Sequence, residues 1–154
     1  MEYVTLKWLH VLSSTIVFGT GIGSAYYLLA ASRQPDVRSA RLVLRHVVIA
    51  DWVFTTPAMI FQPLSGFLLA HQAGIPLGSR WIVWSTVLYV LAAACWLPVI
   101  ALQIRMRNLA GAALAADKPL PSAYQRCFRV WFILGWPALL AFTAIFYLMV
   151  AKPS

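Results

Sequence analysis

The chain has 154 residues, of which 62% are hydrophobic and 10% are charged, and its 12 Lys and Arg against 4 Asp and Glu give a formal net charge of +8. A soluble domain carries roughly 25% charged residues, so this composition excludes a water-soluble globular protein and indicates an integral membrane protein. The basic residues lie mostly between apolar stretches, where they set topology and contact anionic lipid headgroups. They do not indicate nucleic-acid binding.

Four apolar stretches each reach the ~20 residues that a membrane-spanning helix requires. The predicted spans cover residues 3–31, 47–70, 81–104 and 130–151. Short connections make neighbouring helices antiparallel, so the expected fold is all-α, an up-down four-helix bundle in which residues 1–154 form a single transmembrane domain.

The distribution of cations predicts the topology. Of the 12 cations, Lys7, Arg80 and Lys152 lie outside the connections at 32–46 and 105–129, which leaves nine within these two connections. The positive-inside rule therefore places both connections in the cytoplasm and both termini outside, which is the periplasm for a multi-pass protein of the bacterial inner membrane. Apolar residues among the arginines of the first connection indicate that the second helix begins near residue 37.

The first span carries ionisable residues near its N-terminal end. Lys7 and His10 begin a series of positions that advance by threes and fours, and these positions share one face of a helix. The face comprises Lys7, His10, Ser14, Val17, Gly21, Ser24 and Leu28. An ionisable group in lipid is costly unless it faces protein or water, so we expect this face to point into the bundle.

His10 is the strongest candidate for a functional residue. It lies one to two turns below the predicted outer surface, and a neutral imidazole there can ligate haem iron or another metal. The alternative is a structural histidine that bonds a backbone carbonyl or a neighbouring serine. The sequence leaves both interpretations open.

The first functional hypothesis is a redox protein that binds b-type haem, a candidate haem-dependent membrane oxidoreductase with a quinone or another membrane redox partner. In this hypothesis His10 is the axial ligand and Trp96 and Trp136 pack against the macrocycle. Lys7 or Arg80 neutralises the propionates, although the Lys7 side chain can also extend outward to the interface.

His71 is a candidate second axial ligand because it lies on the same side of the membrane as His10. Nine residues separate it from Gln62, however, which on a regular helix puts the two on opposite faces. A kink at Pro63 is needed to bring His71 into line with the polar face of its helix.

Polar residues on the second span form another inward face. Its members are Asp51, Thr55, Ala58, Gln62 and Ser65. The carboxyl group of Asp51 can pair with an arginine or take part in proton transfer. Two further hypotheses are therefore a small oligomeric transporter that uses Asp51 and Gln62 as a path, and a non-catalytic accessory or assembly subunit whose polar faces only pack helices.

The third and fourth spans have faces of their own, and homo-oligomers are a further expectation. The aligned positions are Ser85, Tyr89, Ala92, Trp96, Val99 and Gln103 in the third span, and Phe132, Trp136, Leu139, Thr143 and Tyr147 in the fourth. Trp131 comes near the start of the predicted fourth span, as expected of an aromatic residue at the membrane interface.

The strings Leu6–Leu12, Ala50–Ala58, Pro63–Gly66 and Trp96–Val99 resemble a domain-of-unknown-function family of small four-span bacterial integral membrane proteins. More distantly, the start of the first span is similar to the four-helix membrane protoporphyrinogen oxidase family, which binds b-type haem. This resemblance implies haem association through His10. It does not extend to the lysine that follows a tryptophan in that family's third helix, because the corresponding residue here is Ser85.

Overall fold

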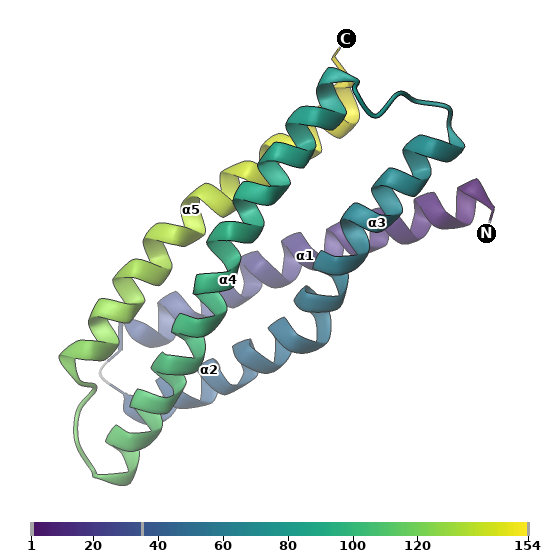
Figure 1. The fold of residues 1–154 in the computed structure, drawn as a ribbon. Helices are drawn as coiled ribbons and strands as arrows, with labels where there is room; N and C mark the ends of the chain where they lie inside the picture. The colour runs from purple at the N-terminus through teal and green to yellow at the C-terminus, as the bar shows by residue number, and fades with distance from the viewer. Residues whose placement is uncertain (1, 35, 154) are drawn as a thin grey trace.

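The computed structural model describes residues 2–34 and 36–153, and within them it contains no β-strand. Its elements are α1 (Tyr3–Ser32), α2 (Val37–Ala50), the π-helical turn η1 (Asp51–Thr55), α3 (Thr56–Gln72), α4 (Arg80–Ala115) and α5 (Ser122–Ala151). The elements α2, η1 and α3 form one continuous span, so the five α-helices make four candidate membrane spans (Figure 1). The predicted all-α, four-span fold is confirmed.

The helices extend well beyond the predicted spans into the arginine-rich connections. Helix α2 begins at Val37, as the sequence indicates, and α4 continues to Ala115 while α5 begins at Ser122. The connections predicted at 32–46 and 105–129 therefore shrink to residues 33–36 and 116–121. Hydropathy identifies only the part of a helix that crosses hydrocarbon, whereas alanine, leucine and arginine favour continued helix on either side.

A left-handed residue ends α4. Asp117 has a φ of 49°, and the Lys118 N–H donates to the Ala113 carbonyl at 2.9 Å, as in a Schellman-type helix end. Pro119 follows and cannot continue the helix.

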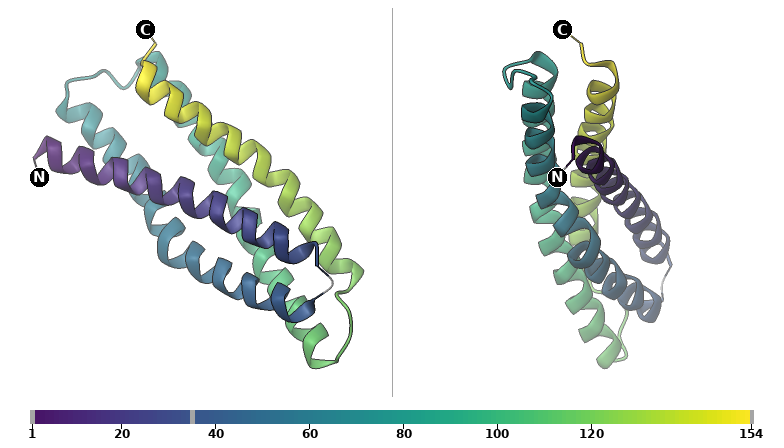
Figure 2. Two further views of the ribbon diagram at one scale, coloured as in Figure 1. Left: turned by 180° about the vertical axis from the view of Figure 1, so that it is seen from behind. Right: turned by 90° about the vertical axis from the view of Figure 1, so that its right-hand side faces the viewer.

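Two long helices form one side of the molecule and the remaining three form the other. Helices α4 and α5 pack along each other as an antiparallel hairpin, while α1 packs against α2 and α3. Helices α1 and α5 make few contacts with each other, and in one of them the rings of Phe18 and Phe146 lie edge to face with centroids 5.3 Å apart. Figure 2 shows α1 crossing the bundle at an angle to α5.

The bundle has two distinct ends. Both termini and the connection between α3 and α4 lie at one end, named here the terminal end (Figure 1). The connections 33–36 and 116–121 lie at the other, named here the arginine end. At the terminal end, the Lys152 ammonium group lies 5.7 Å from the centroid of the Trp81 ring, so the end of α5 contacts the start of α4.

The packed interior is divided into two clusters along the bundle axis. The cluster at the arginine end contains Leu28, Ala40, Leu44, Met106, Ala110, Tyr124, Cys127 and Trp131. The second cluster, nearer the middle, is built on Val17, Ala58 and Met59. A buried hydrogen bond of 2.8 Å between Ser32 and Tyr124 fastens α1 to α5 at the arginine end.

Prolines explain the irregular backbone of the second span. Pro57 has no N–H to donate to the residue four positions earlier, and the preceding turn widens so that the Thr56 N–H donates to the carbonyl of Asp51. Pro63 likewise leaves the carbonyl of Met59 without its helical donor. The hydroxyl of Tyr89 in α4 donates to that carbonyl instead, so the bundle satisfies the group that the proline leaves free.

Candidate functional site

His10 belongs to a hydrogen-bonded cluster between α1 and α3, named here the terminal-end cluster. His10 Nδ1 lies 2.7 Å from Ser65 Oγ, and Gln62 Nε2 donates to the His10 carbonyl at 2.8 Å. Ser65 Oγ also donates to the Phe61 carbonyl at 2.7 Å. Since the serine has one proton, it accepts from His10, so Nδ1 carries the hydrogen and Nε2 keeps a free lone pair.

Packing fixes the imidazole ring in this cluster. A Cβ atom added to Gly66 would lie 3.3 Å from His10 Cε1, closer than most contacts of real Cβ atoms. The ring therefore lies close against α3 at Gly66, and a side chain at this position would require the ring to shift by a few tenths of an ångström. The arrangement matches one alternative from the sequence, a histidine engaged by a serine, although the serine comes from the facing helix.

A cavity of about 350 Å³ lies between α1 and the α4–α5 hairpin, with η1 at one side. Its walls are mostly apolar and aromatic. The lining residues are Val17, Phe18, Gly21, Ile22, Ser24, Ala25, Tyr26, Leu29, Asp51, Thr55, Met59, Trp96, Val99, Gln103, Trp131, Phe132, Gly135, Trp136, Ala138, Leu139 and Phe142. The cavity extends from the Phe18–Phe146 contact, where α1 and α5 meet, toward the arginine end.

Three buried polar residues stand together in this cavity and are named here the cavity cluster: Asp51, Thr55 and Gln103. Their side chains are 5%, 4% and 3% exposed. Thr55 Oγ1 donates to Asp51 Oδ1 at 2.9 Å, and the side-chain amide of Gln103 in α4 approaches the same carboxyl group. The wide turn η1 and the long helix α4 thus bring an acid, a hydroxyl and an amide to one wall.

Several polar atoms of the cavity wall have no partner. Among the described residues, the buried side-chain atoms without a hydrogen bond are Gln103 Oε1, Trp96 Nε1, Trp131 Nε1 and Ser85 Oγ. The first three belong to residues that line the cavity. Buried polar atoms in native proteins are nearly always paired, so an unpaired group calls for a specific explanation.

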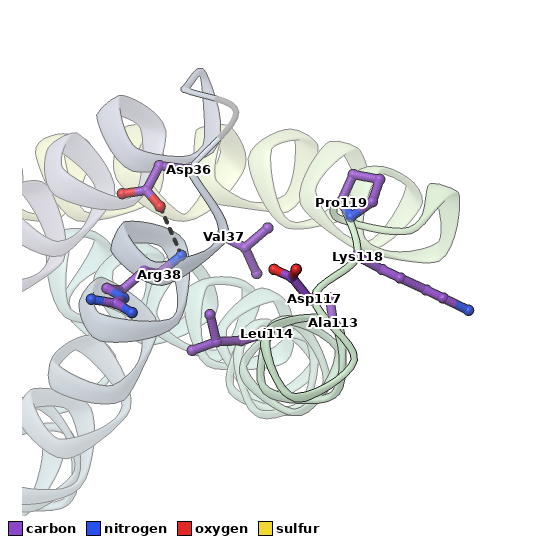
Figure 3. Close-up of a pocket in the computed structure, with 8 residues that line it drawn as sticks. All are labelled: Asp36, Val37, Arg38, Ala113, Leu114, Asp117, Lys118 and Pro119. Carbon is purple, nitrogen blue, oxygen red and sulfur yellow. Dashed lines mark hydrogen bonds between the residues drawn. The ribbon is translucent and has the colours of Figure 1, made fainter.

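A second hollow, of about 370 Å³, lies in the turn region of the arginine end (Figure 3). Asp36 caps α2 there by accepting from the backbone N–H groups of Arg38 and Ser39 at 3.0 and 3.2 Å. The Ser39 hydroxyl also donates to this carboxylate, and it holds the pKa of Asp36 below its usual value, with help from the backbone donors. In the figure, the side chain of Lys118 extends away from Asp36. Arg38 also lines this hollow, and its charge adds a lesser attraction for the ionised Asp36, so the hollow serves the helix cap.

The residues predicted to form a haem pocket are divided between different parts of the structure. Trp96 and Trp136 line the cavity, whereas His10 does not. Lys7 is exposed, and its ammonium group lies 5.9 Å from the centroid of the Tyr3 ring. His71 is exposed in the last turn of α3, six residues beyond Ser65, which on a regular helix turns it about 120° away from the face that meets His10.

The predicted path through Asp51 and Gln62 is divided in the same way. Asp51 and Thr55 belong to the cavity cluster, and Gln62 is committed to the His10 carbonyl in the terminal-end cluster. The eleven residues from Asp51 to Gln62 correspond to about 16 Å of helix.

Two residues of the cavity were missed from the sequence. The sequence spacing puts Gln103 on the aligned face of the third span but does not mark it as a site residue. The position of Trp131 near a span end predicts a place at the membrane interface. The structure buries Trp131 to 6% exposure, nine residues inside α5. The predicted span began only one residue before Trp131, which made this residue look interfacial. Placing the start of the helix further toward the N-terminus would have identified Trp131 as an interior residue.

No curated protein and no solved structure matches the chain. These comparisons therefore give no support for the distant resemblance to the protoporphyrinogen oxidase family. A family model described as a predicted integral membrane protein (DUF2269) matches residues 4–153, nearly the whole chain. The chain therefore belongs to the DUF2269 family of predicted integral membrane proteins.

Proposed function

We propose that this membrane protein binds a lipid-soluble small molecule, an apolar body that carries a polar group, in the cavity between α1 and the α4–α5 hairpin. The observation that carries the proposal is the set of unpartnered buried atoms, Gln103 Oε1, Trp96 Nε1 and Trp131 Nε1, on residues that line an otherwise apolar cavity. Binding sites for small molecules combine mainly apolar walls with a few polar groups in this manner.

The shape of the cavity supports this proposal. Its volume of about 350 Å³ lies within the usual range for ligand pockets, which is roughly 300–1,000 Å³. Small residues of α1, Gly21, Ser24 and Ala25, form one wall and leave the space open. Helices α1 and α5 contact each other at Phe18–Phe146 and again at Ser32–Tyr124, and the cavity lies between these two contacts.

The proposed setting is the bacterial inner membrane, with the arginine end in the cytoplasm. The support for this orientation is the set of nine cations at the arginine end, which the positive-inside rule assigns to the cytoplasmic side. Fusion of a periplasm-active reporter enzyme to the C-terminus tests the orientation, because the reporter is active only if the terminal end faces outward.

Binding of a neutral fluorescent probe tests the proposed function. We expect 1-aminoanthracene, uncharged at neutral pH, to fluoresce in the cavity of the detergent-purified protein. The substitution Gly21→Leu places a side chain in the cavity and should weaken binding by about tenfold or more, equivalent to ~1.4 kcal/mol.

Gly19→Leu is the matched control. Gly19 lies two residues away on α1 and does not line the cavity, and a Cβ atom at either glycine meets nothing within 4 Å. The control variant should bind the probe as the unmodified protein does. Equal binding by both variants would contradict the proposed site.

Haem b association through His10 is a second candidate function, and the hydrogen bond to Ser65 favours it. Histidines that ligate metals usually donate their other ring N–H to a partner that fixes the ring, as His10 Nδ1 does here. Nε2 is then the atom available to iron, and the haem would supply one-electron redox chemistry with a membrane quinone or protein partner. The described residues contain no group of three or more His, Cys, Asp or Glu side chains that could hold a metal ion, so this candidate rests on His10 alone as the proposed ligand.

A visible spectrum of the purified protein with a pyridine haemochrome assay tests this candidate. The expected result is a Soret band that His10→Ala removes and that His71→Ala, at an exposed position, leaves unchanged. Absence of the band, or its persistence in His10→Ala, would exclude haem binding at this histidine.

A further inference from the structure

We infer that the ligand of the cavity is a lipophilic organic cation, whose charged centre lies beside Asp51 and whose apolar body lies against the aromatic walls. The inference rests on the proposed function, since it names the chemical class that the same cavity takes. It is argued from the charge of the lining residues, from the acceptors at the cavity cluster and from the aromatic walls.

The cavity lining carries an acidic residue but no basic one. Asp51 is its one carboxylic acid, and no lysine, arginine or histidine is among the lining residues. The neighbours of the Asp51 carboxyl group are the Thr55 hydroxyl and the Gln103 amide, and neither carries a charge. A buried carboxylate is costly without a positive partner, and an acid inside a membrane protein marks a functional site by default.

The cavity cluster offers acceptors that lack donors. Gln103 Oε1 has no partner, and of the two Asp51 oxygens only Oδ1 accepts the Thr55 hydroxyl. Both residues lie in the wall of the same cavity. A cationic centre placed there would be attracted to all of these oxygens, whereas an anionic centre would be repelled by the carboxylate.

Aromatic rings complete the recognition of a cation with an apolar body. Trp96, Trp131, Trp136, Phe132 and Phe142 line the cavity on the α4–α5 side. The faces of such rings attract cations, most strongly when water is excluded, and their large apolar area covers the rest of the molecule.

Tetraphenylphosphonium and tetraphenylborate test the inference, because the two ions have the same shape and opposite charge. Titration of the unmodified protein, followed by quenching of tryptophan fluorescence and by equilibrium dialysis, should show the cation bound about tenfold or more tightly than the anion. Equal or tighter binding of tetraphenylborate would overturn the inference, without any variant being needed.

Substitutions at Asp51 locate the effect. Asp51→Asn should weaken binding of tetraphenylphosphonium by about tenfold or more, while Asp51→Glu, which keeps the charge, should retain most of it. The matched control is Asp36→Asn, the same change at the exposed helix cap, and it should leave binding unchanged. Unaltered binding of the cation by Asp51→Asn would also overturn the inference.

The neutral probe separates this inference from the proposed function. If Asp51→Asn still binds 1-aminoanthracene and loses tetraphenylphosphonium, the cavity is intact and the acid selects cations. If the unmodified protein binds the neutral probe but does not prefer the cation, the inference fails and the proposed function stands. If Gly21→Leu changes the binding of neither probe, both the proposed function and the inference fail.

Discussion

The terminal-end cluster and the cavity cluster place similar side chains inside the same bundle, yet they treat them differently. In the terminal-end cluster, His10, Ser65 and Gln62 bond one another or nearby carbonyls, and a side chain at Gly66 would press on the His10 ring. In the cavity cluster, Gln103 Oε1 has no partner, and the residue that carries it lines a cavity. Satisfied polar groups hold helices together, whereas unsatisfied ones call for another explanation, which in our proposal is a ligand.

From this difference we expect substitutions in the terminal-end cluster to lower the stability of the protein and substitutions in the cavity cluster to leave it nearly unchanged. Thermal unfolding of the purified protein can be followed with a dye that becomes fluorescent on reacting with thiols. Cys95 and Cys127 are both free and buried, so they react only when the bundle opens.

The largest effect is expected from Gly66→Leu, which would force a side chain into the space that the His10 ring occupies. The added Cβ alone would lie 3.3 Å from His10 Cε1, and overpacking of this kind destabilises by about 1–3 kcal/mol. The variant should therefore unfold at a clearly lower temperature. Gly23→Leu, where a Cβ meets nothing within 4 Å, should change little, and equal effects at both sites would mean that α1 and α3 are not packed closely here.

A smaller loss is expected from Ser65→Ala, which leaves the Nδ1–H of His10 without its acceptor. An unpaired buried donor costs about 1–3 kcal/mol, although polar interactions between helices in membranes average nearer ~0.6 kcal/mol. Ser14→Ala is the comparison, because the Ser14 hydroxyl bonds only the Val11 carbonyl of its own helix, at 2.7 Å. If both variants unfold together with the unmodified protein, the His10–Ser65 bond does not hold the helices.

Gln103→Met should have almost no effect on stability and should nevertheless impair ligand binding. The change removes an unpartnered oxygen and the approach of the amide to Asp51, and these two contributions oppose each other, so we expect a change within about ±0.5 kcal/mol. A loss of more than ~1 kcal/mol would show that the amide supports the fold, which would remove the contrast between the two clusters.

The smallest effect concerns the arginine end and depends on pH. Because hydrogen bonds hold the pKa of Asp36 below its usual value, its ionised form stabilises the folded state at pH values above the pKa of the unfolded chain. This contribution is lost as pH falls through the lower pKa of the folded state. Asp36→Asn keeps a capping side chain without a charge, so the difference in unfolding temperature between the two proteins should narrow on acidification below about pH 4. Tryptophan fluorescence follows the unfolding here, because thiols stay protonated and do not react with the dye at such pH. A difference that stays constant with pH would contradict the assignment.

Much of the helix packing could be predicted from the sequence, since spacing alone identified faces that are indeed buried. Asp51, Thr55 and Ser65 of the second span and Ser85 and Gln103 of the third are all buried. These faces were readable because polar residues in a membrane helix must turn inward, so the few that occur mark the interior.

The fourth span shows where this reasoning fails. Phe132, Trp136 and Leu139 of its aligned face line the cavity, but Tyr147 of the same face is exposed, and the tightly packed positions are Tyr124, Cys127 and Trp131. In a helix that is apolar on every side, periodicity does not distinguish the side that faces lipid from the side that faces protein. The cavity could not be predicted either, because it depends on the angle at which α1 crosses α5 in the folded bundle.

The wide turn η1 connects the parts of the second span that carry the cavity cluster and the terminal-end cluster. Asp51 and Thr55 lie within it, and Gln62 and Ser65 lie beyond it on the same continuous span. A π-helical turn takes up one residue more than an α-helical turn, so the faces on either side of it point nearly as they would in a regular helix one residue shorter. The extra residue therefore widens the wall that presents Asp51 and Thr55 to the cavity, and it does so without turning Gln62 and Ser65 away from His10.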